Sequence, residues 1–354
     1  MRNANIFILS RPVQSGKTTL LQNWLKDKKN VGGILTPDEN GLRKLIDLAS
    51  GKKYDLQLKE DAQGLKIGRF VFDETVFQTA NEALMKTIAQ HDDWIIADEI
   101  GKLEIMQGKG LEPSVSRLIE HFTKHKTSTK LLLVIRDYLL DDAIDHYQLQ
   151  DAKILPADFF INETLPTLNG VVLCGGESKR MKTDKAFINY YKKPQYVRVA
   201  NLLHSFCDDI FLSVNAQQHE RIADDFTKII DRKLYENAGP MTGLLSVLDQ
   251  QNEKALLVAG CDYPCLKRSD LLQLCNARED GADAVCFINK EGFAEPLIAV
   301  YEPACFNILY DFYKNGNRSL QQFLKHVNTK FITAQQEENL TSFDIPEKMK
   351  AFKK

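Results

Sequence analysis

The chain has 354 residues, well beyond the size at which single cores usually split, so two domains are expected. Hydrophobic residues make up 44% and charged residues 27%, which excludes a disordered or fibrous chain. A net charge of -2 gives no cationic field for nucleic acid, and no apolar run approaches the roughly 20 residues that span a bilayer. We therefore expect a cytoplasmic protein with no nucleic-acid or membrane partner.

In the first half, short apolar runs alternate with helix-like stretches, which predicts a parallel α/β unit. The predicted strands are 5–10, 31–36, 70–72, 94–98, 130–135 and 158–161.

The first predicted strand leads into the loop of NIFILSRPVQSGKTT, and this loop ends in SGKTT, as in a P-loop. Lys17 would reach the β- and γ-phosphates and Thr18 would ligate magnesium, with backbone N–H groups around the phosphates. Arg11 stands where the opening glycine of GxxxxGKT belongs. The predicted nucleotide-binding residues of this half are Ser15, Gly16, Lys17, Thr18 and Thr19.

The strand of WIIADEIGKLE ends in two carboxylates, Asp98 for the magnesium shell and Glu99 as a candidate base for water. Arg136 follows a later strand and could face the γ-phosphate, although an arginine there is more often a surface residue. DEIGKLE and GGILTPDE, at 32–39, resemble the archaeal-type thermostable nucleoside-triphosphatase family, a RecA-like P-loop group. The resemblance covers residues 3–163 and implies nucleoside-triphosphate hydrolysis with loose base preference. Arg11 leaves open a non-hydrolysing, nucleotide-dependent adaptor.

The α/β rhythm restarts in the second half, which predicts a second unit, with a helix at 195–206. Polar residues around Pro166 separate the units, so the boundary is placed at about Leu165, giving domains 1–165 and 166–354. The predicted strands of this half are 169–176, 209–215, 227–231, 254–262, 282–287 and 296–301.

The first strand of this half opens GVVLCGGESKRMKTDKA. Gly175 and Gly176 let the backbone approach a ligand closely, and Arg180 and Lys185 can neutralise a triphosphate and the departing pyrophosphate. The alternative is a plain turn followed by solvated charges, but the joint pattern favours a nucleotide loop.

This pattern resembles the signature loop of the molybdenum cofactor guanylyltransferase family, and the resemblance covers residues 169–354. Further matches are GPMTG at 239–243, PLIAVY at 296–301 and GNRSLQQFL at 316–324. The resemblance implies a Rossmann-like sheet that binds GTP at the carboxyl ends of its strands. It places on the nucleotide the residues Leu173, Cys174, Gly175, Gly176, Lys185, Asn215, Asp231 and Asp262.

Asp262 follows an apolar strand, where a carboxylate can ligate the magnesium ion that attack on an α-phosphate needs. The alternative is a cap for a helix that starts near Lys267. Lys185, Arg180 and Asp262 are thus the candidate catalytic residues of this half, together with Glu99 in the first. Two departures from the family are Lys182, where a glycine is usual, and Asp344, where an asparagine contacts the pterin side.

The resemblance implies transfer of GMP from GTP to molybdenum-bound molybdopterin, with Mg²⁺ as cofactor and molybdoenzyme apoproteins as possible partners. CTP as donor, or another phosphorylated acceptor, stays open. His121 and His125 share a helix face without the HExxH order of a zinc site, so we expect them to be solvated. All seven cysteines lie in the second half, and their odd number and spacing favour reduced thiols.

Overall fold

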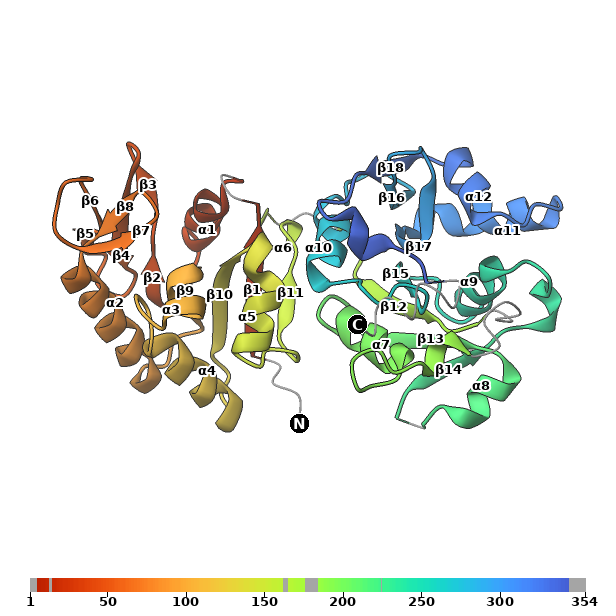
Figure 1. Ribbon diagram of the computed structural model, residues 1–354, viewed down its shortest axis with the longest axis horizontal. Coiled ribbons are helices and arrows are strands. Elements are labelled where there is room, and N and C mark those ends of the chain that lie inside the picture. The colour runs from red at the N-terminus through yellow and green to blue at the C-terminus, as the bar shows by residue number, and fades with distance from the viewer. Residues whose placement is uncertain (1–4, 13–14, 162–164, 176–183, 224, 344–354) are drawn as a thin grey trace. The chain divides into compact units, whose positions relative to one another are not determined.

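The computed structural model describes residues 5–12, 15–161, 165–175, 184–223 and 225–343. The chain divides into two compact units, Met1–Glu163 and Thr164–Lys354. Both are α/β, a RecA-like unit followed by a Rossmann-like unit (Figure 1). None of the described helices combines the length and the apolar character needed to cross a membrane.

The main sheet of the first unit has the strand order β11-β1-β10-β9-β2-β4-β3, and β5 pairs with β4. The strands from β11 to β2 run parallel, whereas β4 runs antiparallel to its neighbours β2, β3 and β5. The P-loop strand β1 and the carboxylate strand β9 are therefore separated only by β10. The strands are β1 (Ile6–Arg11), β2 (Val31–Leu35), β3 (Asp38–Glu39), β4 (Leu42–Asp47), β5 (Lys53–Asp55), β9 (Trp94–Ile100), β10 (Lys130–Arg136) and β11 (Lys153–Leu155).

Helices α1 and α6 bury Leu21, Trp24 and Phe160 against alternate residues of the parallel strands, such as Leu132. The helices α2, α3 and α5 contact strands β2, β9 and β10. The helices of this unit are α1 (Lys17–Leu25), α2 (Glu74–Lys86), α3 (Lys102–Gln107), α4 (Ser114–Lys124), α5 (Leu140–His146) and α6 (Asp158–Ile161).

One strand prediction in this unit is wrong, and one predicted strand lies outside the main sheet. Residues 70–72 form a strand, but it belongs to a separate antiparallel sheet, β6 (Gln57–Leu58), β8 (Phe70–Phe72) and β7 (Leu65–Ile67), which contacts β4 (Figure 1). Residues 158–161 form helix α6, and the edge strand is β11 just before it. Four residues carry too little periodicity to separate a buried strand from a helical turn, and packing of Phe160 on Trp24 decides for the helix.

The sheet of the second unit has the order β14-β13-β12-β15-β17-β16-β18. The first four strands are parallel, but β17 runs antiparallel to β15 and β16, so the expectation of an all-parallel unit is wrong at this edge. Strand β18 was not predicted. The strands are β12 (Leu168–Leu173), β13 (Ile210–Val214), β14 (Thr227–Ile230), β15 (Ala255–Gly260), β16 (Ala284–Ile288), β17 (Ala294–Tyr301) and β18 (Thr329–Ile332).

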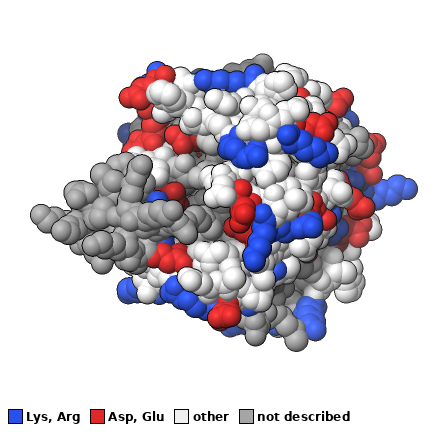
Figure 2. Space-filling model, turned by 90° about the vertical axis from the view of Figure 1, so that its right-hand side faces the viewer, with Lys and Arg blue, Asp and Glu red and all other residues white. Residues whose placement is uncertain are grey.

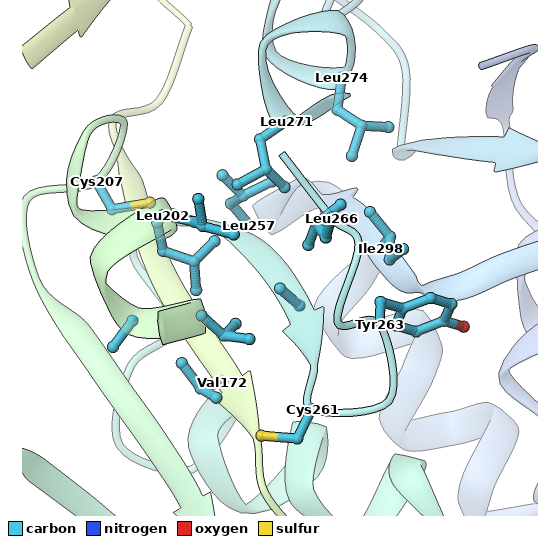
Figure 3. Close-up of a cluster of buried hydrophobic side chains, with 14 of the residues drawn as sticks. Val172, Leu202, Cys207, Leu257, Cys261, Tyr263, Leu266, Leu271, Leu274 and Ile298 are labelled. Carbon is cyan, nitrogen blue, oxygen red and sulfur yellow. The ribbon is translucent and has the colours of Figure 1, made fainter. Parts of the chain in front are cut away.

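Helices cover both faces of this sheet, and successive residues of β12 take opposite faces. Val172 packs with α7 and α10 in the cluster drawn in Figure 3, whereas Val171 packs with α9, α11 and α12. Both faces are therefore dry, and polar ligands can reach the sheet only at its ends. The helices are α7 (Gln195–His204), α8 (Ala216–Arg221), α9 (Pro240–Leu248), α10 (Arg268–Asn276), α11 (Phe306–Lys314) and α12 (Leu320–His326).

Candidate functional site

The P-loop of the first unit ends at Gly16, whose φ of 76° lies in the left-handed region that favours glycine. Helix α1 starts at the next residue, Lys17, so its first N–H groups face the end of the loop. The Lys17 Nζ donates to the carbonyl oxygens of Arg11 at 2.8 Å and Pro12 at 2.9 Å. The buried Ser15 Oγ has no hydrogen-bond partner among the described residues. These donors are arranged for an anion at the helix N-terminus.

Asp98 is buried at 1% exposure, and its Oδ2 accepts hydrogen bonds from the Thr36 backbone N–H at 2.9 Å and from the Thr36 hydroxyl at 3.1 Å. Burial, together with the negative charge of Glu99, raises the pKa of Asp98 to about 6. Thr36 follows β2 directly, so two neighbouring parallel strands fix this carboxylate. A carboxylate oxygen here and the Thr18 hydroxyl are the kinds of ligand that magnesium prefers.

Glu99 adopts a φ of 65° at the end of β9, and its Oε2 contacts two arginines, Arg43 Nη1 at 2.6 Å and Arg136 Nη2 at 3.0 Å. Burial acts to raise the pKa of Glu99, but the charges of the two arginines outweigh it and lower the pKa. Glu99 is thus an anion clamped by two cations. If one of the two arginines moved onto a bound phosphate, Glu99 would lose that ion pair.

The P-loop and Glu99 line the same cavity, which has a volume of about 670 Å³. Its wall carries three arginines, Arg43, Arg69 and Arg136, of which sequence reasoning singled out only Arg136. The cavity also contains the whole predicted nucleotide-binding set, Ser15, Gly16, Lys17, Thr18 and Thr19. Asp98 lies at the neighbouring smaller cavity, beyond Thr36.

The candidate site of the second unit lies at the carboxyl ends of its parallel strands. Asp231 follows β14, and its Oδ1 accepts a hydrogen bond from the Ser213 hydroxyl of β13 at 2.7 Å. Burial raises the pKa of Asp231 to about 6, against the opposite effect of that hydrogen bond. A Cβ at Gly175 would stand 2.7 Å from Asp231 Oδ2, so only glycine lets the loop after β12 pass this carboxylate without a shift.

Gln218 of α8 holds the two described ends of the signature loop together. Its Nε2 donates to the Cys174 carbonyl at 2.9 Å and to the Asp184 carboxylate at 3.0 Å. Asp184 in turn accepts the Ala186 N–H at 3.1 Å, capping the short turn Lys185–Phe187. The position of Lys185 is therefore fixed by a helix that follows it by about 30 residues, and no local motif announced this contact.

Lys185 Nζ lies 3.2 Å from Asp262 Oδ1, which joins the signature loop to the loop after β15. Asp262 is not a helix cap: α10 begins at Arg268, and Asp270 accepts the Lys267 backbone N–H at 2.9 Å. The alternative reading of Asp262 is therefore wrong. No cluster of three or more candidate metal ligands exists within the described ranges, as expected where magnesium takes one or two carboxylates plus substrate phosphates.

Two family models match the chain. Residues 170–331 match the MobA-like NTP transferase domain, and residues 5–154 match the family described as NTPase. The chain joins an NTPase-like unit to a MobA-like NTP transferase unit.

Three similar proteins carry names from molybdenum cofactor biosynthesis. A molybdenum cofactor biosynthesis bifunctional protein of Synechocystis sp. is 32% identical over 143 residues, 40% of this chain but only 41% of that protein. A molybdenum cofactor guanylyltransferase of Pseudomonas entomophila is 24% identical over 190 residues, 53% of this chain and 98% of that protein. The crystal structure of molybdopterin-guanine dinucleotide biosynthesis protein A from Archaeoglobus fulgidus is 19% identical, covers 52% of this chain and 96% of its own, and superposes with a TM-score of 0.44.

Other predicted residues of the transferase unit have mixed positions. Leu173 and Cys174 are buried at the end of β12. Asn215 caps α8, with its Oδ1 accepting the Gln218 N–H at 2.9 Å, and this cap does not use the side-chain amide nitrogen. The predicted residues Gly176 and Arg180, and the departures Lys182 and Asp344, lie outside the described residues.

The cysteines and histidines singled out from the sequence show no metal site. No disulfide joins any of the seven cysteines, all of which lie among the described residues; Cys265 is half-buried and the others are buried. The rings of His121 and His125 stack at 4.6 Å at the end of α4, where His121 is half-buried and His125 is exposed.

Charge on the transferase unit is mixed. On the face drawn in Figure 2, lysines and arginines alternate with aspartates and glutamates, and no large area carries one sign. An anionic substrate must therefore be met by local cations such as Lys185.

Proposed function

We propose that the transferase unit transfers GMP from GTP to molybdenum-bound molybdopterin, forming the guanine dinucleotide cofactor and pyrophosphate. The observation that carries this proposal is the ion pair of 3.2 Å between Lys185 Nζ and Asp262 Oδ1. It lies at the carboxyl ends of the parallel strands, as do Asp231 and Gly175. A cation, an accessible carboxylate and a bare stretch of backbone are what transfer at an α-phosphate requires. The 98% coverage of the Pseudomonas guanylyltransferase supports the choice of reaction.

The residues have separate tasks in this reaction. The backbone at Gly175 approaches the phosphates, and Lys185 neutralises charge that builds on the departing pyrophosphate. Asp231 accepts hydrogen bonds from the nucleotide from its buried position beside the loop. An oxygen of the acceptor phosphate attacks the α-phosphorus in line as the bond to pyrophosphate breaks.

Enzymes of both families generally use a divalent cation, usually Mg²⁺. We propose that Asp262 holds it in the transferase unit, because its side chain is 31% exposed and its recorded ion pair uses Oδ1 alone. Thr18 and Asp98 would hold the ion of the NTPase-like unit. When bound, the cation neutralises phosphate charge and lowers the barrier to displacement.

Donor and acceptor can be tested together. The full chain is incubated with Mg²⁺, molybdenum-bound molybdopterin and one of GTP, CTP or ATP, and the products are analysed by mass spectrometry. GTP should give the guanine dinucleotide and pyrophosphate. A cytosine dinucleotide product would support the alternative donor, and no dinucleotide with any triphosphate would reject this acceptor.

We propose that the NTPase-like unit binds and hydrolyses nucleoside triphosphates in the cavity of about 670 Å³. Support comes from Lys17 and Thr18 at a helix N-terminus facing the cluster of Glu99 and its two arginines. The alternative is an adaptor that binds nucleotide without turnover. It rests on Arg11, which stands where the opening glycine of the P-loop motif belongs. Phosphate release by a chain carrying Asp262→Asn separates the two, because release at the rate of buffer alone would favour the adaptor.

We also propose that the boundary near Leu165 separates two units that work independently, 1–165 and 166–354. Because the proposed product is a guanine dinucleotide cofactor, we propose that molybdoenzyme apoproteins receive it. Limited proteolysis near the boundary, followed by separate activity assays, tests the division.

A further inference from the structure

A second cavity of about 120 Å³ lies beside the nucleotide cavity of the NTPase-like unit. Its walls are mostly aliphatic and aromatic, and they come from four parts of this unit. Leu45 comes from strand β4, and Leu56, Ile67, Phe70 and Phe72 come from the three-stranded sheet and the residue just before it. Helix α2 contributes Phe77, and the segment that includes α3 contributes Leu103 and Leu111.

The far end of this cavity is closed by satisfied polar groups. Glu104 is buried, and its carboxylate accepts the N–H groups of Gly101 at 2.8 Å and Leu111 at 3.2 Å. Two backbone N–H groups thus occupy part of its hydrogen-bonding capacity.

The near end is the wall that both cavities share. Five residues line both: Thr36, Arg43, Phe70, Glu99 and Arg136. Glu99 and its two arginines therefore line both the apolar cavity and the cavity proposed to hold the phosphates. A group at this end could reach a terminal phosphate without leaving the apolar walls.

Size and polarity limit what the cavity can take. An apolar cavity of about 150 Å³ holds benzene and stays free of water. A cavity of about 120 Å³ is smaller than this, so with its one polar end it fits a short branched chain that carries one hydroxyl group. A charged or strongly polar molecule would lose its hydration against these walls.

We propose that this cavity binds a small, uncharged, branched-chain alcohol and that the NTPase-like unit transfers the γ-phosphoryl group of ATP to its hydroxyl. The inference rests on the proposed nucleotide binding at Lys17 and adds an acceptor to that same site. Water is then the substitute acceptor, and hydrolysis is the side reaction.

The transfer balances without a further reactant. The alcohol oxygen forms a bond to the γ-phosphorus, and the bond between that phosphorus and the β,γ-bridging oxygen breaks. ADP leaves with the electron pair of the broken bond, and the hydroxyl proton ends on the phosphate of the new ester. Arg43 and Arg136, which line both cavities, stabilise charge on the group in transfer.

The cavity is not assigned to the nucleobase, because it lies at Asp98 and Glu99. In P-loop proteins these carboxylates serve the magnesium ion and the attacking group at the terminal phosphate, so the base lies toward the opposite end of the nucleotide. An acceptor should therefore bind together with ATP. A molecule that occupied the nucleobase site would instead compete with ATP.

The experiment uses the purified full chain with Mg²⁺, ATP and one of three probes, benzyl alcohol, cyclohexylmethanol or isobutanol. Phosphate ester and free phosphate are measured together by phosphorus NMR, and binding of a fluorescent ATP analogue is recorded with and without each probe. We expect ester from isobutanol, with no loss of nucleotide binding.

Two matched variants locate the acceptor. Ile67 lies on β7 and lines the cavity, whereas Leu65 lies two residues earlier on the same strand, is equally half-buried and does not line it. Ile67→Trp should lower the ratio of ester to free phosphate by about tenfold or more, because the larger ring takes the space of the alcohol. Leu65→Trp should leave the ratio unchanged.

The outcomes separate this inference from the function beneath it. If the analogue does not bind, or binds equally to Lys17→Ala, the proposed nucleotide site fails and the acceptor fails with it. If nucleotide binds and is hydrolysed but isobutanol yields no ester, the acceptor alone is overturned. Competition between isobutanol and the analogue would assign the cavity to the base instead and would also overturn the acceptor.

Discussion

Asp231→Asn is expected to make the transferase unit more stable while it weakens nucleotide binding. Asp231 is a half-buried carboxylate, and burial raises its pKa from 3.8 to about 6. Ser213 supplies the hydrogen bond to Oδ1, and an asparagine oxygen can accept the same bond. The substitution therefore removes the buried charge and keeps the hydrogen bond.

The magnitude follows from the two pKa values. The folded carboxyl group binds its proton more tightly than the unfolded chain does, so the unit loses stability as pH rises from about 3.8 to about 6. Above pH 6 the loss is complete, and at about 1.36 kcal/mol per pH unit it amounts to about 3 kcal/mol. At pH 8 Asp231→Asn should thus raise the free energy of unfolding by up to about 3 kcal/mol, or the melting temperature by roughly 6–12 °C. At pH 4 it should change little.

The two tryptophans of the chain provide an internal control. Trp24 and Trp94 both lie in the NTPase-like unit, so their fluorescence follows the unfolding of that unit only. Circular dichroism and calorimetry follow both units. Asp231→Asn should move a transition seen by the second pair of methods and leave the fluorescence transition in place. Asp280→Asn, at an exposed position of the transferase unit, should move neither.

The result that would refute this reasoning is a variant that is equally or less stable at pH 8, or one that gains the same stability at pH 4 and pH 8. Either would mean that the buried charge carries no net penalty. A confirmed gain in stability with weaker GTP binding would show that the unit keeps a destabilising charge for its ligand.

Three further predictions concern the two sites and the thiols. Asp262→Asn should abolish nucleotidyl transfer and leave the melting profile unchanged, because it removes a cation ligand and no core volume; near-normal transfer would contradict the assignment. Lys17→Ala should stop triphosphate hydrolysis and spare guanylyl transfer, and Lys185→Ala should do the reverse, each by about a hundredfold at its own site. Loss of both activities in one folded variant would mean that the units are coupled. Reducing agents should change neither activity nor stability, because no disulfide joins the seven cysteines; a lower melting temperature on reduction would reveal a disulfide.

The sequence predicted the two α/β units and the strand ends that carry the candidate residues. The long predicted strand 254–262 has a local signature, because its run of apolar residues stops at Asp262. Parallel strands bring such ends to one edge of a sheet. For this reason Asp231 and Asp262, 31 positions apart in the chain, could be assigned to one site before any contact was known.

Short segments were assigned less well, because their local preference is weak. The run 158–161 became a helix where Phe160 packs on Trp24, and the run 70–72 joined a separate antiparallel sheet. Residues 42–90, which include this sheet, resemble the NTPase family in little beyond their pattern of elements. They nevertheless supply Arg43 and much of the wall of the small cavity, which no sequence motif indicated.

The sequence by itself therefore determined which loops carry phosphate-binding residues, because those residues act through the backbone and side chains of one short segment. Tertiary structure alone decided the state of the charges. The two arginines on Glu99 come from β4 and β10, the carboxamide that fixes Asp184 comes from α8, and the burial that raises the pKa of Asp231 comes from its packing beside β12 and β13. Electrostatic energy depends on distance and on exclusion of water, and both are set by residues remote in the chain.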